Sequence, residues 1–284
     1  MPTHLPFDGR AFRLRMGLRT LEPGTWIDAD GHRDADLALK DRLLGERHDE
    51  VVALAPDPDG AAFGACEELV DSIGSELGRR PLPATGVHPV ERAGRLTQED
   101  WCVHLADADG RWRLVAACVC FPTRWVLGHK IGRTVREIHA PVAFYDEQLA
   151  DPVDAFFDRL RPGVEHGVWR LNWNLTDDPT LFQPVAHGRR DLRADITAQN
   201  AGELLWLRVE RQTLVKLERS GAVVFGIRVH EDPLGDLASD SDALDRLARS
   251  LRAMPEPTWA YKGLGAYGEA VLAWIEAGSD GPPS

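Results

Sequence analysis

The chain has few of the residues that mark secreted, membrane-spanning or metal-binding proteins. Its 284 residues include only four cysteines, which show neither a C-x-x-C pair nor a zinc-type spacing. Thiols of this kind in a long chain are typical of a reducing compartment. No run of 18 apolar residues occurs, so no transmembrane helix is expected. The first residues lack the basic and apolar regions of a signal peptide. We therefore expect a cytoplasmic protein without membrane attachment.

Positive charge is also scarce. Lysine and arginine total 33 against 45 aspartate and glutamate residues, which gives a formal net charge of −12. Proteins that bind nucleic acid or anionic membranes normally present a basic surface, so the balance argues against both kinds of partner. The composition is rich in arginine and alanine and poor in lysine, which suggests a bacterial, GC-rich coding sequence.

Hydrophobic periodicity predicts helices near both ends of the chain and strands in its middle. Apolar residues recur every three or four positions in the predicted helices and alternate in the predicted strands. The helices are expected at 34–44, 61–78, 152–160, 239–254 and 268–277, and the strands at 100–105, 112–121, 166–175, 203–211 and 222–230. The proline-rich stretch 80–95 predicts a loop. This order predicts an α+β protein with an antiparallel sheet of at least five strands.

No internal repeat and no change of composition marks a second domain. We expect residues 1–25 to form an extended arm, 26–277 a single domain with helical extensions at both ends, and 278–284 a disordered tail.

Two short motifs match known patterns but lack the necessary context. The segment from Gly263 to Gly268 has the letters G-x-G-x-x-G, yet no predicted strand precedes it, so it is interpreted as a lead into the last helix. The acidic run from Asp28 to Asp36 resembles a calcium loop but has His32 and Arg33 at positions five and six. It is interpreted as a solvated turn before a helix.

Polar residues alternate with apolar ones on two predicted strands. Arg170 and Asn172 share one face of the first strand, and Arg208 and Glu210 share one face of the second. Antiparallel sheets often have one solvated face, and alternation alone favours that interpretation. The alternative is a pocket with polar walls between the sheet and a covering helix.

A single histidine stands at a rigid bend of the chain. His139 is followed by Ala-Pro-Val, and the residue before a proline is pushed towards an extended conformation. Spacing alone favours a core or capping histidine. The alternative is an axial ligand of a metal or heme, for which His129 is the nearest competitor.

Several segments together resemble the heme-dependent oxidative N-demethylase family, and they occur in order between residues 15 and 235. The matching pieces are Leu18-Arg19, Trp26-Ile27, Leu39-Lys40-x-x-Leu43-Leu44, Gln98-Glu99-Asp100, Cys120-Phe121-Pro122-x-x-Trp125, Lys130-Ile131-Gly132, Ile138-His139-x-Pro141-Val142, Arg170-x-Asn172-Trp173, Leu207-Arg208-Val209-Glu210-Arg211-Gln212-Thr213-Leu214 and Ser220-Gly221-Ala222-Val223-x-Phe225-x-Ile227. Ala143 and Glu218 stand where the family tends to have proline. These departures indicate a diverged member, whose substrate need not be dimethylamine.

The resemblance implies a PAS-like antiparallel sheet that binds heme b, uses dioxygen and oxidises a small amine substrate, which then releases formaldehyde. Electrons would come from a separate NADPH-dependent flavin/iron–sulfur reductase. The same resemblance implies roles for individual residues: His139 as axial iron ligand with His129 as the alternative, Glu210 and Arg170 in catalysis, and Arg208, Arg211, Asn172 and Lys130 in cofactor binding.

Two other functions stay open on the sequence. A PAS-type module could sense heme or a small molecule without turnover, although no effector segment is recognisable. A heme-free binding protein could also retain the fold.

Overall fold

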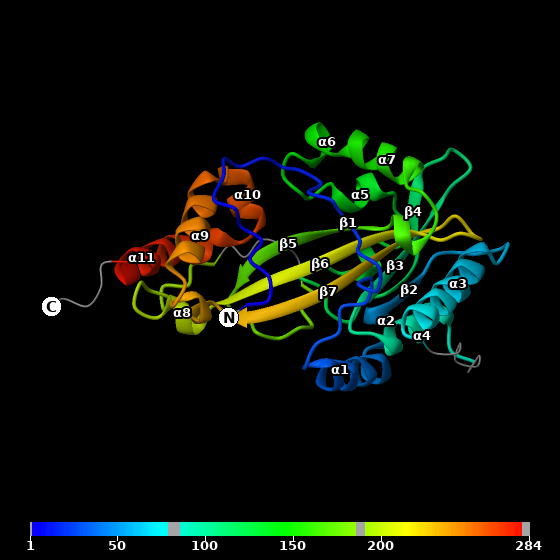
Figure 1. The fold of residues 1–284 in the computed structure, drawn as a ribbon, viewed down its shortest axis with the longest axis horizontal. Helices are drawn as coiled ribbons and strands as arrows, with labels where there is room; N and C mark the ends of the chain where they lie inside the picture. The colour runs from blue at the N-terminus through cyan, green and yellow to red at the C-terminus, as the bar shows by residue number, and fades with distance from the viewer. Residues whose placement is uncertain (1, 79–85, 186–190, 280–284) are drawn as a thin grey trace.

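The protein is built around one long antiparallel sheet, as the computed structural model shows (Figure 1). The structure describes residues 2–78, 86–185 and 191–279. In this part of the chain seven strands follow the order β1-β5-β6-β7-β3-β4-β2, and every neighbouring pair is antiparallel. The strands are β1 (Arg19–Thr20), β2 (Val52–Leu54), β3 (Asp100–Ala106), β4 (Trp112–Cys118), β5 (Val168–Thr176), β6 (Trp206–Lys216) and β7 (Val223–Pro233).

Three groups of helices surround the sheet, each on its own side (Figure 1). One face carries η1 (Leu127–His129), α5 (Val135–His139), α6 (Tyr145–Gln148) and α7 (Ala150–Arg159). The other face carries α1 (Arg33–Glu46), α2 (His48–Val51), α3 (Ala61–Glu76) and α4 (Pro89–Leu96). The far end of β5, β6 and β7 meets α8 (Ala201–Leu204), α9 (Ser241–Ala253), α10 (Glu256–Tyr261) and α11 (Gly268–Ser279). Short 3-10 turns η2 (Val164–His166), η3 (Leu234–Leu237) and η4 (Leu264–Ala266) join these parts.

Strand register divides the sheet residues between its two faces. In β5 and β6, Asn172 lies opposite Glu210, so their side chains share a face, which we call the site face. In β6 and β7, Val209 lies opposite His230, and these side chains share the other face, which we call the back face. The two faces therefore present different residues of the same strands to different helices.

Most of the hydrophobic core lies behind the back face and at the end of the sheet. One cluster joins the sheet to α1, α3 and α4 through residues such as Trp26, Leu69 and Trp101, which are buried. A second cluster joins Leu205 and Leu207 to the C-terminal helices.

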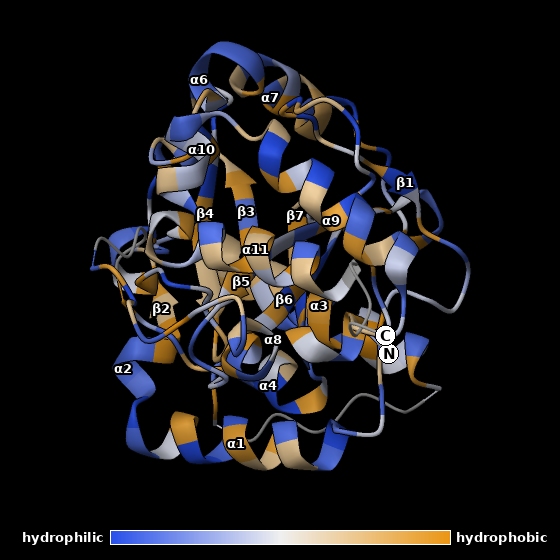
Figure 2. Ribbon diagram, turned by 90° about the vertical axis from the view of Figure 1, so that its left-hand side faces the viewer, coloured by the Kyte–Doolittle hydropathy of each residue, from blue (hydrophilic) through white to orange (hydrophobic). Residues whose placement is uncertain are grey.

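Hydrophilic and hydrophobic residues alternate along α1 and α9 (Figure 2). The helix α9 buries an apolar face with Leu244, Leu247 and Leu251, which holds it in place. The helix α1 instead buries Asp36 and Lys40 together with Leu43 and Leu44.

The α+β class and the antiparallel sheet predicted from the sequence are confirmed. The PAS-like character and the limits of the domain remain predictions. The predicted tail of residues 278–284 lies outside the described residues from position 280 onwards. The segment from Gly263 to Gly268 does lead into the last helix, α11.

The predicted loop at 80–95 is wrong for its second half, where α4 begins at Pro89. Proline is tolerated in the first turn of a helix because its missing N–H would have no partner there. His88 caps this helix by accepting a hydrogen bond from the Val90 backbone N–H. The prolines therefore mark the start of a helix as well as a loop; residues 79–85 lie outside the described part.

All four cysteines are buried and free of disulfides. Among the residues described, no helix has both the length and the apolar character needed to cross a bilayer.

Candidate functional site

A row of polar side chains lies on the site face where β5 and β6 pair. Arg170 lies opposite Gln212, Asn172 opposite Glu210, and Asn174 opposite Arg208. Alternation predicts that Arg170 and Asn172 share one face of β5 and that Arg208 and Glu210 share one face of β6, and the register brings the two rows together. The polar row is covered by helices, so this part of the site face is not a simple solvated surface.

The carboxylate of Glu210 is held in place by two neighbouring amides. Its Oε2 accepts a hydrogen bond of 2.7 Å from Gln212 Nε2 and one of 3.2 Å from Asn172 Nδ2. Only 7% of the Glu210 side chain is exposed. A carboxylate that is buried and oriented in this way can pair with a cation or take part in proton transfer.

His139 ends the short helix α5, which is fixed by its first residues. Thr134 and Glu137 form a capping box, in which each side chain bonds the backbone N–H of the other. His139 Nδ1 lies 2.8 Å from the Val135 carbonyl oxygen and must donate to it, because a carbonyl can only accept. Nε2 is then the unprotonated nitrogen of a neutral ring, which is the form that binds a metal.

The surroundings of His139 favour that neutral ring. Burial lowers its pKa to about 4, and the nearby cations Lys130 and Arg170 act in the same direction. The ring stacks on Tyr145 of α6, with centroids 4.7 Å apart and planes 13° apart. His139 is therefore an uncharged, positioned imidazole at neutral pH.

Lys130 connects the turn after η1 to the end of α5. Its Nζ donates a hydrogen bond of 3.1 Å to the Ile138 carbonyl oxygen, and it lies 5.1 Å from the centre of the Trp125 ring. Burial lowers the pKa of Lys130, while negative charge nearby, including that of Glu210, raises it. The lysine thus lies close to both His139 and Glu210.

Two buried polar atoms beside His139 have no hydrogen-bond partner among the described residues. They are Nε of Arg170 and the hydroxyl oxygen of Tyr145. Burial lowers the pKa of Arg170, whereas the charge of Glu210 and then Tyr145 favour its charged form. An unpaired buried donor costs about 1–3 kcal/mol, so native proteins seldom keep two of them together. A bound group with acceptor atoms and an iron that takes an imidazole fits this set of residues.

The C-terminal helix α10 adds two residues that the sequence did not point to. Burial lowers the pKa of Lys262 to about 8, and the charge of Glu210 opposes this shift. Lys262 Nζ donates to the Trp173 carbonyl oxygen and lies over the Trp173 ring. Burial and the charge of Glu210 raise the pKa of Tyr261. The site therefore has side chains from the sheet, from α5 and α6, and from the end of α10.

Two residues predicted for the site, Arg211 and His129, lie elsewhere, and a third, Arg208, lies on the site face with all its donors bonded to other groups. Arg208 is 1% exposed, and its five N–H donors bond Thr123, Phe121, Thr180, Leu181 and Glu231. Arg211 points to the back face, where it donates to the carbonyl oxygens of Thr25 and Trp26. His129 ends η1 and is exposed. The structure thus brings together His139, Lys130, Arg170, Asn172 and Glu210.

Sequence reasoning missed several neighbours of this group. Gln212 could have been found, because it follows Glu210 by two positions and so shares its face. His104 of β3 is buried and lies close enough to His139 for protonation of His139 to lower the pKa of His104. Tyr145 and Lys262 gave no signal, because each lies in or beside a helix of four to six residues, too short to show a period.

Comparison with known families gives one match. Residues 76–272, well over half of the chain, match the family model described as haem-dependent oxidative N-demethylase, alpha subunit-like. The matched region includes every side chain of the site described above.

Proposed function

Because the chain belongs to this family of haem-dependent oxidative proteins, we propose that it binds heme b at the site face and oxidises a small amine with dioxygen. The observation that carries the proposal is the neutral His139, oriented by the Val135 carbonyl beside two buried polar atoms without a hydrogen-bond partner in the part of the chain that the structure describes. A heme site needs an apolar slot, an axial ligand and a few polar groups, and these residues supply the last two.

His139 Nε2 is the proposed axial ligand. Its Nδ1 bond to a backbone carbonyl is the usual outer partner of a metal-binding histidine, which sets the tautomer and the ring orientation. Heme would supply the activation of dioxygen, for which none of these side chains is suited. His129 is the alternative ligand, and its exposed position on η1 is less favourable.

The excess of positive charge around Glu210 suits a cofactor that carries two carboxylates. Arg170, Lys130 and Lys262 all interact with the one negative charge of Glu210. Bonds between charged donors and carboxylates are the strongest hydrogen bonds that proteins make. We propose these three cations as the partners of the heme propionates. Arg208 is left out because all five of its N–H donors are used in bonds to other protein groups, and Arg211 because it points to the back face.

Glu210 is the proposed partner of the substrate nitrogen. A protonated amine would form an ion pair with its carboxylate and could leave its proton on Glu210 before oxidation. Asn172 and Gln212 hold the carboxylate while this happens. Loss of a methyl group as formaldehyde consumes one dioxygen, two external electrons and two protons, and the second oxygen atom leaves as water. We propose that a separate NADPH-dependent flavin/iron–sulfur reductase supplies these electrons.

The test is an absorption spectrum of the protein expressed with a heme precursor, beside the variants His139→Ala and His129→Ala. We expect a Soret band in the wild type and in His129→Ala, and its loss or a shift in His139→Ala. A band lost only in His129→Ala would move the ligand to η1. No band in any sample, even after hemin titration, would leave a heme-free binding protein.

A further inference from the structure

The back face of the sheet carries a second group of metal-binding side chains, remote from the site face. His230 of β7, Asp28 of the loop before α1 and His4 of the N-terminal arm each offer one ligand atom, and these atoms lie within 4.8 Å of one another. His230 is 7% exposed, and the other two are half-buried. The proposed heme site uses none of the three.

Each of these residues is held in place by its own element. The arm is fixed by Phe7, which is buried against Trp173, and by Gly9, whose N–H donates to Ser250 Oγ. The N–H of Asp28 donates to Glu99 Oε1 at 2.6 Å. His230 belongs to the β6–β7 ladder, opposite Val209. The three side chains converge because the fold positions them, since 226 residues separate the two histidines in the sequence.

The distances are close to those of a metal centre. Nε2 of His230 lies 3.0 Å from Asp28 Oδ2, and Nε2 of His4 lies 3.7 Å from the same oxygen. Zinc ligands at about 2.0–2.1 Å in a tetrahedron lie about 3.3 Å from each other. His4 Nε2 is buried and has no hydrogen-bond partner among the described residues. A metal ion would give this nitrogen the partner that it lacks.

We propose that His4, Asp28 and His230 bind one divalent transition-metal ion of the zinc class. Two imidazoles and one carboxylate are a donor set for zinc, cobalt or iron(II), and not for calcium or magnesium, which prefer oxygen ligands. The ion would fasten the N-terminal arm to β7, because His4 is the only one of the three ligands on the arm.

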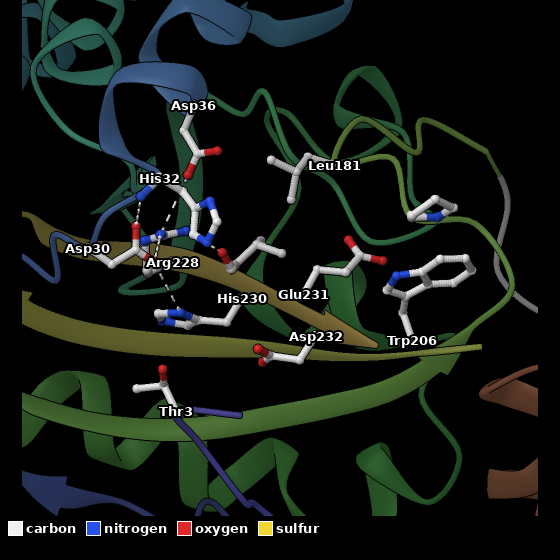
Figure 3. A pocket seen from close by; sticks show the side chains of 12 residues that line it. Thr3, Asp30, His32, Asp36, Leu181, Trp206, Arg228, His230, Glu231 and Asp232 are labelled. Carbon is white, nitrogen blue, oxygen red and sulfur yellow. Dashed lines mark hydrogen bonds and ion pairs between the residues drawn. The ribbon is translucent and has the colours of Figure 1, made fainter. Parts of the chain in front are cut away.

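A cavity beside the triad leaves room for further ligands. It has a volume of about 240 Å³ and is lined by His230 together with Thr3, Asp30 and Asp232 (Figure 3). Water in this cavity could complete the coordination, as in zinc sites with three protein ligands. Arg211 Nε, 3.9 Å from Asp28 Oδ2, and the cavity residue Arg228 oppose a cation, while Asp30 and Asp232 favour one.

The acidic run before α1 therefore differs from its predicted role as a solvated turn. Asp30 is bonded by Arg228 at 2.7 Å and by Gln98 at 2.9 Å, and Asp28 faces the two histidines. The spacing of the loop does not fit an EF-hand calcium site. The partners now proposed come from distant parts of the chain, which no local spacing could show.

Zinc binding to the tag-free full chain, measured by calorimetry, tests the proposal. We expect one zinc ion per chain in the wild type and more than a 100-fold weaker affinity in His4→Ala and in Asp28→Asn, because loss of an outer-shell partner alone costs about 10- to 100-fold. His32→Ala is the matched control. His32 lines the same cavity but is not in the triad, so its variant should bind zinc like the wild type.

Two further measurements complete the test. Cobalt(II) should give absorption bands of low-coordinate cobalt that disappear in His4→Ala, and calcium should not compete with zinc. Failure of the wild type to bind zinc, or unchanged binding in His4→Ala, would overturn the proposal. The His139→Ala variant should bind zinc normally, so loss of the heme proposal would leave this one standing.

Discussion

At the residue scale, the charge of Glu210 can be removed without removing its hydrogen bonds, so a single substitution tests its role. Glu210→Gln keeps an acceptor oxygen for Asn172 and Gln212 but removes the negative charge. We expect the Soret band to be retained and amine turnover to fall by on the order of 100-fold or more, because general acid–base groups contribute about that much. Formaldehyde release, measured with the reductase present, checks this.

The control for that variant is Glu203→Gln, which removes an exposed carboxylate on α8. It should leave turnover unchanged. A pocket that senses ligands without turnover would show no formaldehyde in the wild type and the same ligand-induced spectrum in Glu210→Gln. A Soret band lost in Glu210→Gln would instead assign Glu210 to the binding of heme.

His104 predicts a dependence of stability on pH. Burial lowers the pKa of His104 to about 4, below its usual 6.5. The unfolded chain therefore binds a proton that the folded protein excludes, and stability falls as the pH drops from about 6.5 towards 4. At pH 5 the loss from this one group, relative to pH 7, is about 2 kcal/mol.

Urea unfolding of His104→Leu at pH 7 and pH 5 measures that contribution. The variant loses the bond to the Val223 carbonyl at both pH values, so the pH-dependent difference is the relevant quantity. We expect the variant to lose about 2 kcal/mol less than the wild type over this range. An equal loss in both proteins would show that His104 titrates normally. Exposed His129→Leu should behave like the wild type.

At the scale of elements, α4 is packed on the sheet through a glycine. A side chain at Gly94 would collide with the Cys118 sulfur of β4. We expect Gly94→Ala to destabilise the protein by about 1–3 kcal/mol, because the helix must move off the sheet. Thermal unfolding measures the change.

Gly64 is the matched position in α3, where the space around a new side chain is open. Gly64→Ala should stabilise the protein by about 0.5–1 kcal/mol through the better helix propensity of alanine. Destabilisation of similar size in both variants would contradict the close contact between α4 and β4.

The long elements could be predicted from the sequence, and the short ones could not. The strands of the site, β5 and β6, have nine and eleven residues, so alternation identifies both them and their polar face. α6, α8 and α10 have four to six residues and contain less than two turns, so they leave no periodic pattern. Tyr145 and Lys262 were missed for this reason.

At the scale of the whole molecule, the sheet separates the two groups of side chains for which we propose functions. Neighbouring residues of one strand face opposite sides, so Glu210 and Arg211 belong to different environments although they are adjacent in the sequence. The resemblance to a family implies that both belong to one site, Glu210 in catalysis and Arg211 in cofactor binding, because a motif does not record the side on which a residue lies. Such a distinction needs the register of the strands and the helices that cover each face.

The contacts that fix α5 and the His139 ring affect the thermodynamics of ligand binding. The capping box holds the first turn of this helix, Lys130 holds the Ile138 carbonyl, and Val135 holds the His139 ring. The imidazole thus loses its rotational freedom when the chain folds. The binding free energy of a ligand therefore does not include the entropic cost of fixing this side chain. A ligand of His139 therefore binds a side chain that is already in place. The fit of the ligand, rather than a rearrangement of the protein, then determines its dissociation rate.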